Sequence, residues 1–302
     1  MGTGASMCAK RNQERTATMP PSKLPPTIRQ RRLGAELRRL RELAELSVTE
    51  AGRLHGSTQS RISNIESGGY PVSADRVRTL ARLYGCLDQP FVDALAGMTG
   101  GRTRGWWDEY REILPADSLE LAELEHHAVA MRVACAIHLP GLLQTTDHAR
   151  ALFKDVVPPF DPPVVEHLLS FRIKRQAVIY GERPTSLSTV IHESALRMGF
   201  GGRKVARAQL EHLGDMSERE HISVRVVPFG SGSYPSSGSG IIYLGDVVPQ
   251  LDTVQLDTDT ASGYVGAQPQ LARYRAVLDR LEVTALTPEK SRDLIHNIAR
   301  SM

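Results

Sequence analysis

The segment LSVTEAGRLHGSTQSRISNIESG, residues 46–68, constrains the fold more than any other part of the chain. Ser47 and Glu50 stand three residues apart, which is the spacing of a capping box and predicts the start of a short helix. Gly56 interrupts this helix, and Thr58 is a good N-cap for a further helix that runs nearly to the end of the segment. Two short helices with separate caps and a glycine between them predict an all-α unit.

Three more helices are expected around this pair. The first begins near Ile28, where apolar residues recur at helical spacing. These residues are Leu33, Leu37, Leu40 and Ala44. The other two helices run from Ser73 to about Tyr84 and onward from Asp88, and each has apolar residues to bury on one side. The five helices together predict a compact all-α domain over residues 28–96.

The charge of the chain is divided between its two parts. Residues 1–105 hold 17 Lys and Arg against 9 Asp and Glu, a balance of +8, whereas residues 106–302 hold 20 against 25, a balance of −5. A basic part joined to an acidic one indicates that only the first part meets a polyanion. Charge alone leaves open the alternative of a merely well-solvated surface.

The second helix of the capped pair has an apolar and a polar side. Ile62 and Ile65 are three residues apart and predict a buried stripe. The opposite side carries Gln59, Ser60, Ser63 and Asn64. Gln and Asn side chains can donate to and accept from adenine at once, and a recognition helix must project such groups into a major groove about 12 Å wide. This pattern predicts a helix that reads DNA sequence.

Residues 31–95 resemble the helix-turn-helix of the Cro/C1-type repressors, the XRE family, most strongly in TQSRISNIESG, residues 58–68. The resemblance implies that the four polar residues just named contact bases. It places phosphate contacts at Thr58 and Arg61, and we expect arginines on the polar side of the first helix to add to them. Those arginines are Arg38 and Arg39.

The resemblance also implies a structural ion pair. Glu66 falls where the family often has a buried acid, and Arg41 falls at the position of its partner on the first helix. A buried carboxylate is costly unless it is paired. The combination therefore favours a true helix-turn-helix over an all-α domain whose polar helix is merely solvated.

Four positions depart from the family's pattern. Ala51 and His55 stand at its usual leucine positions in the second helix, and Gly52 replaces a small alanine. Glu45 stands where a glycine commonly ends the first helix. These departures predict weaker packing of the second helix and leave the polar face of the third unaffected.

The flanks of this domain lack regular patterns. Residues 1–27 are rich in Pro, Thr and Ser and predict a disordered tail without the apolar stretch of a signal peptide. The stretch GMTGGRTRG, residues 97–105, has four glycines in nine residues and predicts a linker. No apolar run approaches the roughly 20 residues needed to cross a bilayer, and the widely spaced Cys8, Cys86 and Cys135 favour a reducing cytoplasm.

Residues 106–302 alternate helical and strand patterns and predict an α+β domain, so we expect a multidomain chain with the all-α domain first. Strands are expected over residues 187–192, 222–228, 240–244 and 253–256. Helices are expected over residues 118–136, 145–153, 163–180, 193–213, 268–281 and 288–300, after an interrupted helical start at Trp106.

This second domain resembles DUF5753, an antitoxin-like family that follows such a helix-turn-helix in many actinobacterial regulators. The run PGLLQT, residues 140–145, is the most specific match, and Leu124-Glu125 and Arg175-Gln176 are among the others. The resemblance implies a small partner protein encoded nearby. From the residues alone, the run suits a tight turn that leads into a helix, and Arg175-Gln176 could simply brace one.

No catalytic or metal-binding pattern is complete. The segment HESAL, residues 192–196, lacks the second zinc-binding histidine. His126 and His127 are adjacent, so on a helix they point about 100° apart. The Gly/Ser stretch of residues 230–240 has no nucleophile elbow, and GFGGRK, residues 199–204, lacks the spacing of a phosphate loop. We therefore expect no enzyme, no cofactor and no metal site.

These observations predict a sequence-specific transcriptional regulator that binds double-stranded operator DNA as a homodimer, in the cytoplasm and on the nucleoid. Its second domain would serve dimerisation, partner binding or effector binding. One alternative is an antitoxin-like protein that sequesters a small partner protein and autoregulates its operon. Another is a regulator that senses a small molecule in an apolar pocket of a few hundred Å³.

Overall fold

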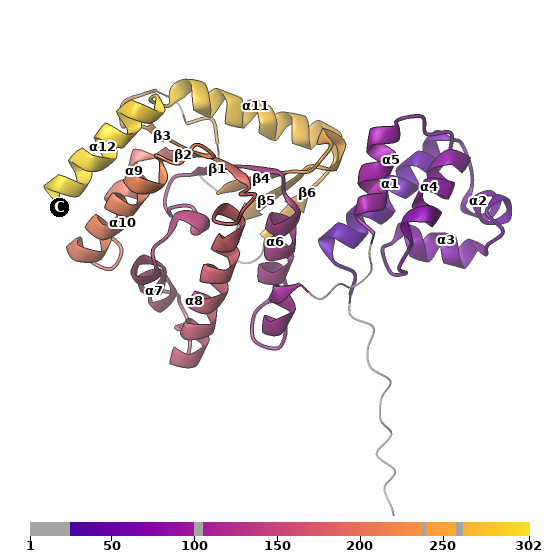
Figure 1. Ribbon diagram of the computed structural model, residues 1–302, viewed down its shortest axis with the longest axis horizontal. Helices are drawn as coiled ribbons and strands as arrows, with labels where there is room; N and C mark the ends of the chain where they lie inside the picture. Colours follow the sequence, from indigo (N-terminus) through magenta and orange to yellow (C-terminus); the bar gives the residue numbers. More distant parts are fainter. Residues whose placement is uncertain (1–24, 100–104, 233, 237–239, 258–261) are drawn as a thin grey trace, which may run out of the picture.

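The computed structural model describes residues 25–99, 105–232, 234–236, 240–257 and 262–302. A helical domain stands beside a larger domain built on a β-sheet (Figure 1). The expected order, all-α first and α+β second, is confirmed. Most of the predicted tail, residues 1–24, and the middle of the predicted linker, residues 100–104, lie outside the described residues.

Helices with side-chain caps form the first domain. They are α1 (Ile28–Leu43), α2 (Val48–Leu54), α3 (Gln59–Glu66), α4 (Ala74–Leu83) and α5 (Gln89–Gly97). The caps Thr27, Ser47, Thr58, Ser73 and Asp88 each accept a hydrogen bond from the backbone N–H three residues further on. Such caps satisfy N–H groups that a helix leaves without an intrahelical partner. The helices therefore begin where these residues in the sequence indicate.

Helix α3 ends against the first half of α1 at a place where only glycine fits. A Cβ atom on Gly34 would lie 2.5 Å from the carbonyl oxygen of Glu66 and 2.7 Å from that of Ile65. Just after α3, Gly68 would bring a Cβ atom to 2.9 Å from the backbone of Gln30. Backbone atoms cannot turn aside as a flexible side chain can. Helices α1 and α3 are thus held in direct backbone contact.

The turn between α1 and α2 contains a residue in an unfavourable conformation. Glu45 has a φ of 55°, and no other non-glycine residue of the described segments has a positive φ. This conformation costs an L-residue roughly 1–2 kcal/mol. The missing family glycine at this position therefore has a local energetic cost. Helix α2 nevertheless forms, with Ala51 fully buried.

One sheet organises the second domain. Its strands are β1 (Ala130–Cys135), β2 (Ser186–His192), β3 (Ile222–Val227), β4 (Ile241–Gly245), β5 (Thr253–Asp257) and β6 (Ser262–Val265). The α-helices are α6 (Ala116–His127), α7 (Thr146–Lys154), α8 (Pro162–Gln176), α9 (Glu193–Arg197), α10 (Arg203–Met216), α11 (Gln268–Thr284) and α12 (Pro288–Ser301). Short 3-10 helices are η1 (Trp106–Tyr110), η2 (Gly141–Leu143), η3 (Ala177–Ile179) and η4 (Pro249–Leu251).

The helix expected over residues 118–136 is wrong in its second half. Helix α6 ends at His127, and β1 follows as a strand between β2 and β4. Met131 and Val133 face one apolar cluster and Ala134 faces another. Arg132 is the one charged residue of β1, and it pairs with Asp279 and Glu282 of α11. One charged residue in a short strand gives no polar alternation that would distinguish it from a buried helix.

Two further expectations are corrected. The helix expected over residues 193–213 is broken between α9 and α10, where Gly199, Gly201 and Gly202 all have positive φ, a conformation open to glycine. Strand β6 was not expected at all, because the pattern of its four residues is too short to indicate a strand.

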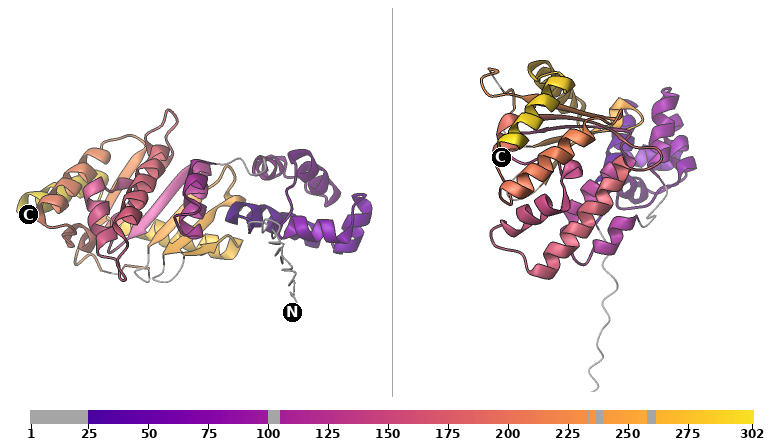
Figure 2. Two further views of the ribbon diagram at one scale, coloured as in Figure 1. Left: turned by 90° about the horizontal axis from the view of Figure 1, so that it is seen from below. Right: turned by 60° about the vertical axis from the view of Figure 1, so that its left-hand side comes forward.

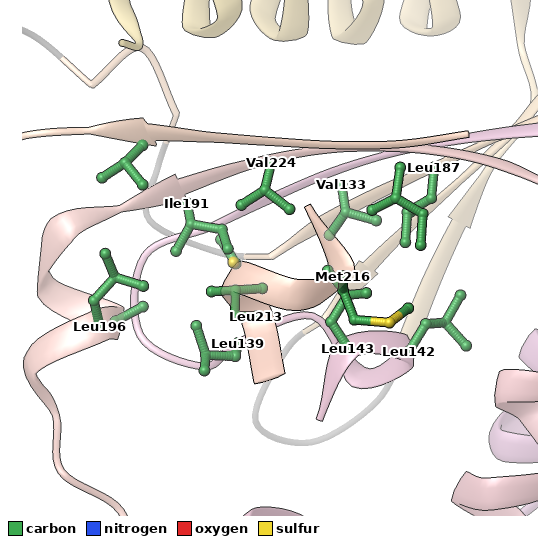
Figure 3. Packing of buried hydrophobic residues seen from close by; sticks show 14 of the residues in the cluster. Val133, Leu139, Leu142, Leu143, Leu187, Ile191, Leu196, Leu213, Met216 and Val224 are labelled. Atoms are coloured by element: carbon green, nitrogen blue, oxygen red, sulfur yellow. The ribbon is translucent and has the colours of Figure 1, made fainter. Parts of the chain in front are cut away.

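The sheet order is β3-β2-β1-β4-β5-β6. Strands β1, β2 and β3 are parallel, whereas β4 is antiparallel to β1 and to β5, and β5 is antiparallel to β6. Helix α11 covers one face, and α9, α10 and α12 pack on the other (Figures 1 and 2). Figure 3 shows the apolar core on this second face, where Val133 and Leu187 of the sheet pack with Leu213 of α10. The C-terminus lies at the end of the domain remote from the first domain (Figure 2).

The second domain holds the beginning of α1 through polar contacts. The backbone N–H of Ile28 donates to the carboxylate of Glu120 at 2.6 Å. Arg32 donates to the carbonyl oxygen of Gln250 at 2.5 Å, and it also donates to that of Gly266. Burial raises the pKa of the Glu120 carboxyl. The two domains are therefore in direct contact.

An apolar contact reinforces this docking. Val248 and Leu251, from the connection between β4 and β5, are buried in the same cluster as the core of the first domain. At the edge of the contact, the Arg29 guanidinium lies 3.5 Å from the Asp246 carboxylate. The core of the first domain is thus completed by side chains of the second.

We predict that Gly34→Ala destabilises the first domain by about 2 kcal/mol, because the added methyl group forces α1 and α3 apart. Urea denaturation of the full chain measures the change. The matched control is Gly97→Ala at the exposed end of α5, where an added Cβ meets no atom within 4 Å and a change within about 0.5 kcal/mol is expected. Equal effects of the two substitutions would contradict the close approach.

Candidate DNA-binding interface

Helix α3 separates its buried and exposed residues as the sequence predicts. Ile62 and Ile65 are 1% and 3% exposed and pack in the core of the first domain. The opposite side consists of exposed polar side chains. They are Gln59, Ser60, Ser63 and Asn64. All four predicted base-reading residues therefore lie on one accessible face, with their amides and hydroxyls turned away from the core.

The predicted phosphate ligands at the start of α3 differ in their surroundings. The hydroxyl of Thr58 accepts the backbone N–H of Arg61 at 3.2 Å, so it is already engaged as the helix cap. The Arg61 guanidinium lies over the Tyr70 ring, 4.9 Å from its centroid. This stacking holds the half-buried Arg61 beside the reading face.

Arg76, in the first turn of α4, is a further arginine close to this region. Burial lowers the pKa of the His55 imidazole at the end of α2, and the charges of Arg76 and Arg61 lower it further. No ion pair of Arg61 or Arg76 occurs within the described part of the chain. Cations without carboxylate partners are suited to contact DNA phosphates. Only the fold brings Arg76 near His55, so no sequence spacing could indicate it.

Arg38 and Arg39 are exposed on α1 but are already paired. The Arg38 guanidinium lies 2.7 Å from the carboxylate of Glu42, and that of Arg39 lies 2.7 Å from the carboxylate of Glu36. Arg39 also lies over the Phe91 ring, 5.7 Å from its centroid. A phosphate would have to displace these intrahelical pairs, which makes both arginines weaker candidates than Arg61.

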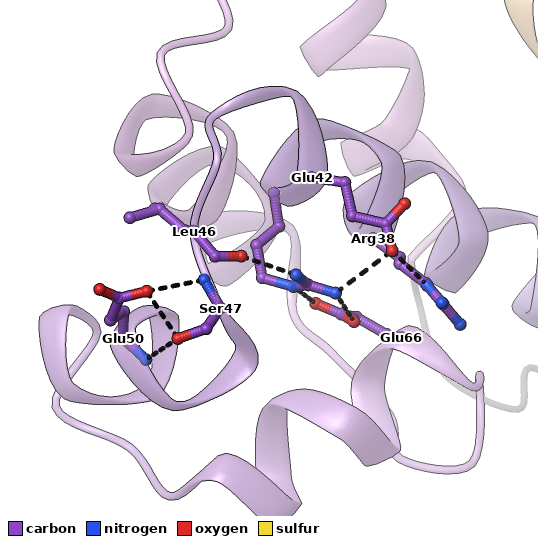
Figure 4. A network of polar contacts seen from close by, with 7 residues as sticks. Arg38, Glu42, Leu46, Ser47, Glu50 and Glu66 are labelled. Carbon is purple, nitrogen blue, oxygen red and sulfur yellow. Dashed lines mark hydrogen bonds and ion pairs between the residues drawn. The ribbon is translucent and has the colours of Figure 1, made fainter.

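Arg41 and Glu66 form a two-pronged salt bridge between α1 and α3 (Figure 4). Nε and Nη2 of Arg41 donate to the two carboxylate oxygens of Glu66 at 2.7 and 2.9 Å. Nη1 donates to the carbonyl oxygen of Leu46 at 2.7 Å. Both side chains are 7% exposed, and the hydrogen bonds to Glu66 raise the pKa of Arg41. One guanidinium thus joins α1, α3 and the turn before α2.

In the second domain, the PGLLQT run forms a tightly bonded turn around η2. The Gln144 amide donates to the carbonyl oxygen of Leu139 at 2.7 Å, and its side-chain oxygen accepts from Arg172 at 2.5 Å. The side chain of Gln176 donates to the backbone oxygen of Gln144 at 2.7 Å. Gln209 of α10 accepts the backbone N–H of Thr145 at 2.7 Å. These contacts give the run a structural role.

Two other residues of the DUF5753 pattern form a buried ion pair. Arg175 on α8 donates two hydrogen bonds, at 2.7 and 2.8 Å, to the carboxylate of Glu125 on α6. Their side chains are 10% and 2% exposed. The sequence suggested that Arg175 could brace a helix. It does so through Glu125, which it joins to α8.

The histidines considered for catalysis or metal binding have other contacts. His126 and His127 lie against the Trp107 ring, with centroid distances of 5.2 and 6.5 Å. Nδ1 of His192 contacts the Ser194 hydroxyl at 2.7 Å. The described residues contain no group of three or more His, Cys, Asp or Glu side chains that could hold a metal ion. Within the same residues, none of the helices combines the length and the apolar character that crossing a bilayer requires.

Comparison with known families divides the chain in the same way as the structure. A helix-turn-helix domain family matches residues 32–95. A family described as a domain of unknown function, DUF5753, matches residues 119–297. No curated protein and no solved structure matches the chain. The XRE-type helix-turn-helix followed by DUF5753, expected from the sequence, is thereby confirmed.

We predict that Glu66→Ala destabilises the first domain by about 3 kcal/mol, because it removes both hydrogen-bonded carboxylate oxygens and leaves the buried Arg41 with only the Glu42 carboxylate, 3.7 Å away. The matched control is Arg38→Ala, which breaks the exposed pair with Glu42 (64% and 52% exposed), leaves Arg41 untouched and should cost at most about 0.5 kcal/mol. Urea denaturation of the full chain compares the two. A loss for Glu66→Ala no larger than that of the control would mean that this salt bridge does not hold α3.

Proposed function

Since the chain belongs to the DUF5753 family and carries a helix-turn-helix domain before it, we propose that it is a sequence-specific, DNA-binding regulator of transcription. The observation that carries this proposal is the polar face of α3, in which four exposed side chains stand opposite buried Ile62 and Ile65. A solvated structural helix has no need of this composition beside Arg61, an arginine that has no ion-pair partner in the described part of the chain. A recognition helix requires it.

The geometry supports a division of roles on the DNA. Gln59 and Asn64 carry the amides that suit adenine edges in the major groove. Arg61 on the same helix, and Arg76 near His55, would contact the phosphates that position the helix without reading sequence. The second domain contacts the beginning of α1, so the reading face of α3 remains accessible.

We also propose that the chain acts as a homodimer on two operator half-sites, with the acidic second domain supplying the dimer contact. One helix-turn-helix covers only a half-site, and half-sites one helical turn apart are about 34–36 Å apart. The net charge of −5 over residues 106–302 keeps this domain from competing for DNA. Such a regulator would work in the cytoplasm, on the nucleoid.

The second domain is proposed to carry out no chemistry of its own. Glu193 illustrates the support for this: its carboxylate accepts from Arg197 at 2.7 Å and from the backbone N–H of Phe229 at 2.8 Å. Both oxygens of this carboxylate therefore serve the fold. A regulatory domain needs such structural hydrogen bonds. It also needs a site that binds the molecule or partner that carries the signal.

We predict that Gln59→Ala and Asn64→Ala each weaken binding to the cognate operator by about 1–3 kcal/mol and weaken binding to random DNA much less. The operator is first selected from a random-sequence library with the full chain, and fluorescence anisotropy then measures both affinities. Gln89→Ala, an exposed glutamine at the start of α5, is the matched control and should change neither affinity.

Phosphate contacts should give a different result. Arg61→Ala and Arg76→Ala are expected to weaken cognate and random DNA binding alike, whereas Arg78→Ala, whose side chain pairs with Asp93 at 3.2 Å, should have little effect. Equal losses on cognate and random DNA for the substitutions at Gln59 and Asn64 would remove the base-reading assignment.

The dimer is tested on the operator itself. Removing one of its two half-sites should weaken binding of the full chain by about tenfold or more, because the second contact then loses its effective concentration. Sedimentation of the free chain should show a dimer at the concentrations used. A monomer in solution that binds one and two half-sites equally well would refute the proposed assembly.

A further inference from the structure

A cavity of about 670 Å³ lies in the second domain at the carboxyl end of β1. Its walls come from β1, from the loop that follows it and from the start of β4. Apolar side chains predominate, among them Met131, Val133, Leu142, Leu187 and Ile242. Figure 3 shows Val133, Leu142 and Leu187 on this side of the sheet. Small-molecule sites in proteins have this size and this mainly apolar lining.

The cavity lies beside the strand at which the strand order of the sheet reverses. From β1 the chain continues to β2 and β3 on one side, whereas β4 pairs with the other side of β1. Ligands of open α/β sheets bind beyond the carboxyl ends of the strands, at the point where the strand order reverses. Ala134, near the end of β1, pairs with Ile241 of β4, which places the cavity at this switch point.

The charged groups around the cavity nearly cancel. Arg175 and Glu125, which line it, are already joined by two hydrogen bonds. Glu125 raises the pKa of the buried Arg175, and Asp257, which also lines the cavity, adds to this effect. Burial lowers the pKa of the neighbouring Arg172 to about 9, and it also lowers the pKa of His138 on the cavity wall. Among the described residues, two arginines therefore stand against two carboxylates.

Strand β4 connects the cavity with the DNA-binding domain. Its first residues, Ile241 and Ile242, line the cavity, and its last residue leads into the connection that holds the first domain. Tyr243 of β4 donates to the buried carboxylate of Asp252 at 2.6 Å, which ties the strand to the end of that connection. Between them lie Val248 and Leu251, which pack in the core of the first domain, and Gln250, which bonds Arg32 of α1. A shift of β4 would therefore move the contact surface of the helix-turn-helix.

We propose that this cavity binds an uncharged, mainly apolar small molecule with a hydrogen-bonding group, and that its occupation changes DNA affinity through β4. The second half of this proposal rests on the proposed DNA-binding function. The first half rests only on the lining, volume and charge balance of the cavity.

Binding is tested with N-phenylnaphthylamine, an uncharged apolar fluorophore, and with the anionic anilinonaphthalene sulfonate. The full chain should bind the uncharged probe saturably at one site and the anionic probe at least tenfold more weakly. The absence of saturable binding, or equal affinity for the two probes, would overturn the assignment.

Location is tested by filling the cavity. Val133→Phe should lower the affinity for the uncharged probe at least tenfold, whereas Val283→Phe, the same substitution at a 77% exposed position on α11, should leave it unchanged. Ile242→Phe on β4 serves as a second filling variant, and circular dichroism confirms that each variant folds. If the folded filling variants keep wild-type affinity, the probe binds elsewhere and the site is wrong.

Coupling is tested with the selected operator. A saturating concentration of the uncharged probe should change operator affinity at least threefold, and the operator should change probe affinity by the same factor, as linkage requires. Unchanged operator affinity would overturn the coupling and leave the cavity assignment standing. A chain that binds the probe but no DNA would instead refute the proposed function alone.

Discussion

The salt bridge between Arg41 and Glu66 is the contact on which the DNA-binding geometry depends. It fastens the end of α3 to the second half of α1, while its third hydrogen bond holds the turn before α2. Gly34, in the first half of α1, supports the same junction, because the absence of a Cβ atom lets the backbones of α1 and α3 touch. A buried charge requires its partner, so the orientation of the recognition helix follows from the position of α1.

Helix α1 is also the element that the second domain holds. Glu120, Gln250 and Gly266 bond its beginning, and Val248 and Leu251 extend the apolar core beneath it. The same helix therefore positions α3 at one end and meets the second domain at the other. This arrangement leaves the polar face of α3 exposed.

Local features of the chain were predictable because they depend on neighbours in sequence. The helix starts at Ser47, Thr58, Ser73 and Asp88, the buried stripe of Ile62 and Ile65, and four of the strands lie where the residues indicate. Strand β1 was not predictable in this way, because Arg132 is its one charged residue and the rest of its short pattern suits a buried helix equally well. Its strand character follows from pairing with β2 and β4, which come from distant parts of the chain.

The sequence by itself determined the order of the domains, the helix-turn-helix and the polar face of α3, since caps, turns and helical periodicity act over a few residues. Only the tertiary structure decided which surfaces meet. It brought Arg76 near His55, joined Arg41 to Glu66, docked Val248 on the first domain and opened a cavity beside β1. These features arise from contacts between residues far apart in the chain, and their distances are set by packing of the whole core.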